Sequence, residues 1–99
     1  MTPTGTSQTI NWNNGNSQVL NLTSATGTVV ITMTNPKPGA TYFVRIAQGA
    51  TPRQISFATV VKFPGGIAPV LTNTASALDS IVIFYDGTSY YGNYSLNYV

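Results

Sequence analysis

The chain has 99 residues and a mass of 10.5 kDa, a length that accommodates one small domain. Charged residues make up only 6% of it, against about 25% in an ordinary soluble domain. The sequence contains no Cys and no His, which excludes disulfides, thiolate metal sites, thiol nucleophiles and the usual general base. We therefore expect no metal, no cofactor and no enzymatic activity.

The net charge of +2 rests on four isolated cations, so we expect neither nucleic acid nor a membrane surface as a partner. The N-terminus is polar and lacks a signal sequence, and no apolar run is long enough to span a membrane. Hydroxyl and amide side chains take the place of charge. Because 42% of the residues are hydrophobic and 11% aromatic, the composition is that of a folded protein rather than a disordered one.

Alternating apolar and polar residues predict strands along most of the chain. The clearest case is the segment 28–35, where Val29, Ile31 and Met33 fall on one face. The predicted strands lie near 7–13, 18–23, 28–35, 41–48, 54–58, 60–63, 80–86 and 89–97. The only helical candidate, Thr74 to Leu78, is too short to be stable alone.

The segment from Ile81 to Tyr85 is apolar on both faces, which predicts a central strand covered on each side. The Asp86-Gly87 pair that follows predicts a hairpin with a type I′ turn. Many short strands separated by turns predict an all-β fold, a small antiparallel β-sandwich or jelly-roll-like barrel of about seven to eight strands. The chain is then one domain over residues 1–99, with residues 1–6 as a flexible N-terminal arm.

A domain this small has a limited core, and with no disulfide or metal to support it we expect oligomerisation to stabilise it. The few surface charges give the same indication, because strand edges without charges are poorly protected against pairing.

The two carboxylates, Asp79 and Asp86, are explained by turn and capping roles and not by catalysis. The C-terminal tyrosines have two interpretations: core or subunit-interface residues, which we favour, or aromatic surfaces that stack on sugar rings beside Asn side chains. Trp12 has the same two interpretations, with packing favoured. The candidate interface or ligand contacts are Trp12, Phe63, Tyr90, Tyr91, Tyr94 and Tyr98.

Three blocks, at residues 38–42, 61–69 and 81–92, occur in an order that resembles a small β domain of tailed-bacteriophage virion proteins. The resemblance extends over roughly residues 18 to 98. The family usually has Lys-Trp-Pro-Gly-Gly where this chain has Phe63, so an aromatic residue is kept but the indole N–H is lost.

The resemblance implies a non-enzymatic structural protein on the exterior of the virion, made in the host cytoplasm. It would be a capsid decoration or cement protein, or a head-fibre component, and commonly a homotrimer. Its partners would be its own copies and the major capsid protein or another virion protein. The first predicted strand follows Met1 almost directly, with no fibre shaft, which favours this function.

Two alternatives stay open. The chain could be a tail-fibre tip that recognises a host surface glycan or protein. A single-stranded nucleic-acid binder is a weaker hypothesis, because it needs cations beside the aromatic side chains and none lies within the tyrosine-rich segment.

Overall fold

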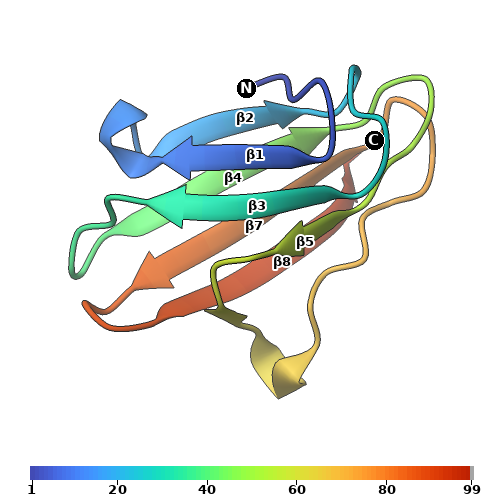
Figure 1. Ribbon diagram of the computed structural model, residues 1–99. Helices are drawn as coiled ribbons and strands as arrows, with labels where there is room; N and C mark the ends of the chain where they lie inside the picture. The colour runs from blue at the N-terminus through green and yellow to red at the C-terminus, as the bar shows by residue number, and fades with distance from the viewer. Residues whose placement is uncertain (99) are drawn as a thin grey trace.

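The computed structural model describes residues 1–98 and shows an all-β protein whose eight strands form two sheets (Figure 1). The strands are β1 (Ser7–Asn11), β2 (Ser17–Asn21), β3 (Val29–Thr34), β4 (Thr41–Ala47), β5 (Ile55–Phe57), β6 (Val61–Lys62), β7 (Leu78–Tyr85) and β8 (Tyr90–Tyr98). Two short 3-10 turns, η1 (Trp12–Asn14) and η2 (Pro64–Gly66), complete the set. Each predicted strand is confirmed with small shifts at its ends, whereas the helical candidate is a turn leading into β7.

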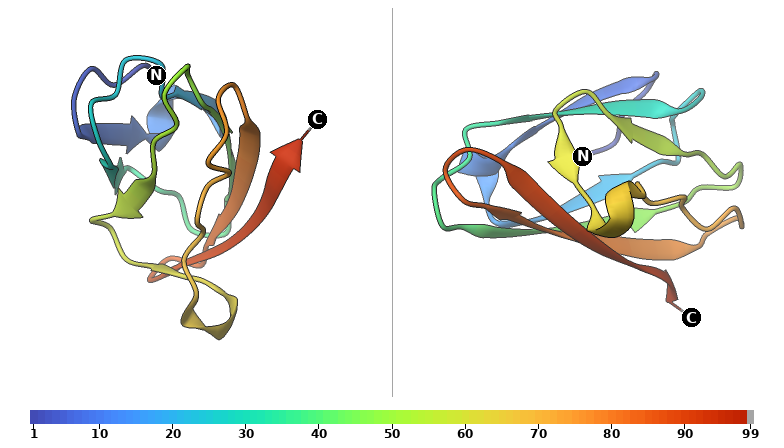
Figure 2. Two further views of the ribbon diagram at one scale, coloured as in Figure 1. Left: turned by 90° about the vertical axis from the view of Figure 1, so that its right-hand side faces the viewer. Right: turned by 90° about the horizontal axis from the view of Figure 1, so that it is seen from below.

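The first six strands alternate between the sheets. One sheet has the order β1-β3-β5 and the other the order β2-β4-β7-β8-β6. Each consecutive pair, β1 with β2, β3 with β4 and β5 with β6, therefore forms one coil of a solenoid-like path, with the two sheets on opposite sides of the core (Figure 2). We refer to these pairs as the first, second and third coils.

Strands of successive coils pair in parallel: β1 with β3, β3 with β5, and β2 with β4. The all-β class and the strand number expected from the sequence are therefore confirmed, but the sheets are mixed, with parallel pairs between coils. The expected antiparallel sandwich or jelly-roll-like barrel describes only the β4–β7 and β7–β8 pairs. Alternation shows which side chains are buried but not which way the neighbouring strand runs. Here the strand in the opposite sheet supplies the long crossover that parallel pairing needs.

The chain ends with an antiparallel hairpin of β7 and β8, which lies in the five-stranded sheet between β4 and β6. The predicted hairpin is confirmed, but its turn is not type I′. Four residues join the strands, and Gly87 at φ 103° has positive φ while Asp86 does not. The Asp86 carboxylate instead accepts hydrogen bonds from the backbone N–H groups of Thr88 and Ser89, at 2.8 and 2.7 Å.

One core fills the space between the sheets, and strands of both sheets alternate buried and exposed side chains around it. Trp12 stacks on Tyr42 in this core, with ring centroids 4.1 Å apart and planes inclined by 13°. The stack joins η1 of the first coil to β4 of the second and so fixes their relative position.

The third coil is held by Phe63, which follows β6 and packs against Phe57 and Tyr94 with ring centroids 5.7 and 6.0 Å away. Phe63 also lies directly over Gly92 of β8. A Cβ atom at position 92 would come within 2.6 Å of the Phe63 ring, so only glycine lets the ring approach the strand this closely.

Residues 1–6, expected to form a flexible arm, are hydrogen-bonded to the body of the protein. The Met1 ammonium donates to the Val19 carbonyl at 2.7 Å, and the Met1 carbonyl accepts from the Asn21 N–H at 2.8 Å. Gly5 and Thr6 accept further backbone hydrogen bonds. The N-terminal segment thus covers part of the free edge of β2.

Candidate binding face

The outward surface of the five-stranded sheet is apolar at its centre, and no part of the chain that the structure describes covers it. Strand β7 was expected to be covered on both faces, but only Ile81, Ile83 and their neighbours on the inner face are buried. On the outer face Val82 and Phe84 remain 43% and 40% exposed. The strand is central within its sheet, but one of its two apolar faces is left open.

The strand register gathers the outward side chains into rows. Phe84 of β7 lies opposite Tyr91 of β8, and Tyr91 lies opposite Lys62 of β6. The Lys62 Nζ atom sits 5.7 Å from the centre of the Tyr91 ring, a cation–π distance. In the next row Val82 is paired with Phe43 on one side and Asn93 on the other.

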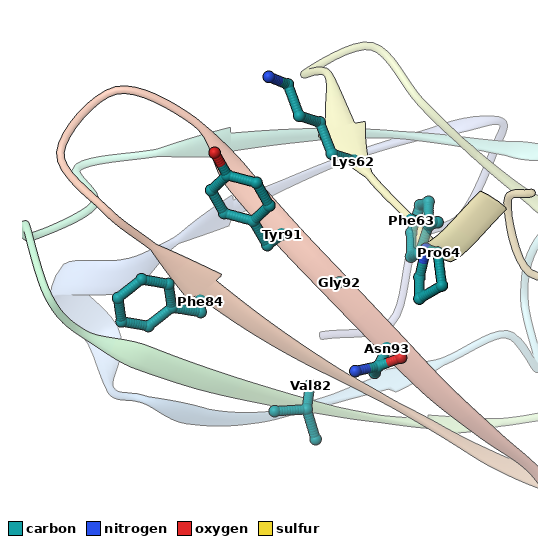
Figure 3. A pocket seen from close by; sticks show the side chains of 8 residues that line it. All are labelled: Lys62, Phe63, Pro64, Val82, Phe84, Tyr91, Gly92 and Asn93. Carbon is teal, nitrogen blue, oxygen red and sulfur yellow. The ribbon is translucent and has the colours of Figure 1, made fainter. Parts of the chain in front are cut away.

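We call this surface the aromatic face; it comprises Phe43, Arg45, Lys62, Val82, Phe84, Tyr91 and Asn93. Part of it is hollowed into a pocket of about 480 Å³ over the β7–β8 hairpin (Figure 3). Its lining consists of Lys62, Phe63, Pro64, Val82, Phe84, Tyr91, Gly92 and Asn93. Pro64, directly after Phe63, lines one wall.

The six candidate contact residues do not form one site. Trp12, Phe63 and Tyr90 are buried in the core, and Tyr94 is partly buried against it. Burial therefore gives Trp12, Phe63 and Tyr90 a place in the core.

Two of the six candidates remain at the surface. Tyr91 belongs to the aromatic face, whereas Tyr98 is 53% exposed and its hydroxyl lies 3.0 Å from the Ser80 hydroxyl. That hydrogen bond lowers the pKa of Tyr98 below its ordinary value.

Sequence reasoning missed most of the aromatic face. Phe43 was assigned to an alternating strand without a statement that its face would be open, Phe84 was placed in a strand expected to be covered on both faces, and Lys62 was treated as an isolated cation. One sequence pattern indicates such a face: two neighbouring strands carry apolar residues at outward positions, and the sequence has no helix long enough to cover them. The pairing of Lys62 with Tyr91 depends on β6 lying beside β8, which sequence spacing does not show.

A second exposed apolar surface lies at the free edges of β5 and β6. Val60, Ile67 and Val70 are 76%, 64% and 71% exposed, more than the other exposed large apolar side chains among residues 1–98. Ile67 and Val70 follow η2, which projects from the two sheets (Figures 1 and 2), and Val60 directly precedes β6. Beside them an apolar groove of about 510 Å³ runs between β5, β6 and the η2 segment. We call this surface the third-coil edge.

The two carboxylates lie at opposite ends of β7, so they cannot act as a pair. Asp79 is buried and accepts hydrogen bonds from the Thr72 N–H, the Thr72 hydroxyl and the Asn97 N–H, at 2.7, 2.7 and 2.8 Å. It ties the segment before β7 to the end of β8. Asp86 has its pKa held below the ordinary value by the backbone N–H groups of Ser89 and Thr88.

Among residues 1–98, two buried polar atoms lack hydrogen-bond partners, the Trp12 indole N–H and the Tyr90 hydroxyl. Burial raises the pKa of Tyr90, and the nearby indole N–H only partly offsets this effect. The pair lies within the core and offers no surface to a ligand.

Comparison of the chain with protein-family models, curated proteins and solved structures finds no match. Within residues 1–98, no helix has the length and apolar character needed to cross a membrane.

Proposed function

We propose that this protein is a non-enzymatic structural component of a tailed-bacteriophage virion, a capsid decoration, cement or head-fibre protein that binds the outer capsid surface as a homotrimer. The order of the three sequence blocks supports the virion assignment. The observation that carries the assembly role is the third-coil edge. The family resemblance and the exposed surface are independent of each other.

The third-coil edge has the properties of a surface that is covered in an assembly. Its exposed apolar side chains come from the segments on either side of β6 and η2, and β5 and β6 are edge strands, where unpaired backbone groups are also available. The opposite edge differs, because Met1 hydrogen-bonds to β2 there. One end of the solenoid-like path is thus partly capped and the other is open to a further copy or to a capsid protein.

The first test is the absolute mass of the protein in solution, measured by light scattering over a dilution series. A mass of about 31 kDa, three times 10.5 kDa, is expected. The triple variant Val60→Ser, Ile67→Ser, Val70→Ser should shift it toward the monomer. Val30→Ser provides the matched control, because Val30 is an exposed apolar residue on the three-stranded sheet.

The second test is cosedimentation with capsids of the phage that encodes the protein, after removal of the native copies. We expect the wild type and Val30→Ser to bind the capsids and the triple variant to lose binding. A monomer at all concentrations that also fails to cosediment would refute the proposal.

A second candidate function is supported by the aromatic face. A tail-fibre tip that recognises a host surface glycan or protein would need an open, preformed surface of aromatic and amide side chains, and Phe84, Tyr91 and Asn93 offer one.

A further inference from the structure

The pocket of the aromatic face is built on rigid elements. Val82 and Phe84 come from β7, and Tyr91 and Asn93 come from β8, two strands that pair along most of their length in the interior of the sheet. Their positions are fixed by the backbone register, so the floor of the pocket is formed before any ligand binds. A volume of about 480 Å³ falls in the range of small-molecule sites and is large enough for one or two sugar rings.

The floor of the pocket is apolar and exposed to solvent. Val82, Phe84 and Tyr91 keep 43%, 40% and 43% of their surface exposed, and they lie side by side on one face of the hairpin (Figure 3). Placing a flat C–H surface over these side chains would remove apolar area from water without rearranging the protein. The C–H face of a pyranose ring is such a surface.

The polar groups around the floor are few and specific. The Asn93 amide can both donate and accept a hydrogen bond, which matches the vicinal hydroxyls of a sugar. Lys62 supplies one ammonium at the rim, 5.7 Å from the centre of the Tyr91 ring. No Asp or Glu is found among the described residues that line the pocket.

The charge around the pocket is therefore one-sided. Arg45 lies on the same outer face, two positions along β4 from Phe43. The carboxylate at the end of the hairpin, that of Asp86, accepts two backbone hydrogen bonds in the turn and is not part of the lining. A ligand in the pocket thus meets an ammonium with no acidic lining residue to offset it, which favours an anionic ligand.

We propose that this pocket binds an anionic saccharide, with one sugar ring over Phe84 and Val82, its hydroxyls on Asn93 and its carboxylate, sulfate or phosphate on Lys62. This inference rests on the second candidate function, recognition of a host glycan, and names its ligand class. Single-stranded nucleic acid fits less well, because it needs cations spaced along a groove and the pocket lining has Lys62 alone.

The test is an array of immobilised saccharides that contains neutral sugars and their carboxylated, sulfated and phosphorylated counterparts, probed with the whole protein. Binding is expected only to the anionic members and should weaken as NaCl is raised. Phe84→Ala and Lys62→Gln should each weaken it about tenfold. The controls are Val30→Ala and Lys37→Gln, which alter an exposed apolar side chain and a cation outside the aromatic face and should leave binding unchanged.

The possible results distinguish failure of the anionic-saccharide proposal from failure of glycan recognition. Equal binding to neutral and anionic sugars, unaffected by Lys62→Gln, overturns the anionic class and leaves glycan recognition standing. Binding only to an oligo-dT probe included on the array, lost in Phe84→Ala, overturns the saccharide in favour of nucleic acid. Absence of binding to every saccharide overturns both the ligand and glycan recognition, and leaves a host protein as the receptor of the second candidate function. Cosedimentation with capsids reports separately on the structural role.

Discussion

At the scale of single residues, burial decides the roles that sequence left open. Trp12 is 3% exposed and Tyr90 is 6% exposed, so both act in the core. A sequence in which an aromatic residue lies beside amides is compatible with either a core or a surface position. Only the arrangement of the coils shows which face of a strand points to the core. The same reasoning explains why Phe84, at an apolar position between apolar neighbours, could not be recognised as exposed from its local sequence.

Tyr90 gives a prediction about pH. Burial raises its pKa in the folded state, so its contribution to stability is complete below the unfolded value of about 10 and is lost as the pH rises through the higher folded value. Tyr90→Phe should remove this alkaline loss. At neutral pH it should change the free energy of unfolding by less than about 1 kcal/mol, because the hydroxyl has no hydrogen-bond partner to lose.

The measurement is urea denaturation of both proteins at pH about 7 and about 11, on either side of the unfolded tyrosine pKa. Tyr91→Phe is the control, because its hydroxyl belongs to an exposed side chain. Equal alkaline losses in wild type and Tyr90→Phe would show that another group is responsible.

At the scale of strands and turns, the sequence predicted the number and bounds of the strands well, because apolar alternation reports directly on which face is buried. The hairpin at Asp86 was predicted for a related reason, since Asp and Gly favour turns. Strand direction and sheet order were not predictable. They depend on contacts between segments that are distant in the sequence, such as Val61 with Tyr90.

Gly92 tests how the third coil is attached. Gly92→Ala would place a methyl group 2.6 Å from the Phe63 ring and 3.0 Å from Val61, so β6 must shift away from β8. We expect a loss of about 1 to 3 kcal/mol in the free energy of unfolding, the usual cost of overpacking. Chemical denaturation measures it.

Two further variants make this test specific. Gly5→Ala is the matched control, because a Cβ there meets no atom within 4 Å and the position has no positive φ. In a Phe63→Leu background the cost of Gly92→Ala should be smaller, since the shorter side chain leaves room for the methyl group. Equal costs in both backgrounds would place the strain elsewhere.

At the scale of the whole molecule, the few cationic residues are well protected except at the third coil. Arg45 lies in β4 between two paired strands, and the Arg53 Nε atom donates to the Ala25 carbonyl at 3.2 Å. Lys37 precedes Pro38, a bond that trypsin does not cut. Lys62 is exposed and lies in a two-residue strand that pairs only with β8.

Trypsin should therefore cut the native protein slowly and first after Lys62, giving fragments 1–62 and 63–99. Mass spectrometry of a digestion time course identifies the first site. Lys62→Gln should extend the lifetime of the intact chain. An earlier cut after Arg45 would mean that the centre of the five-stranded sheet opens more readily than its edge.

The position of β8 between β7 and β6 has a consequence for the protein as it is being made. Val61 of β6 pairs with Tyr90, which the ribosome adds 29 residues later. At about 5 to 20 residues per second, β6 waits roughly 1.5 to 6 s for its partner. Until β8 is available, Phe63 cannot pack over Gly92 and β6 has no strand to pair with. The third coil is therefore the last of the three coils to take its place, and it does so only after β8 has left the ribosome.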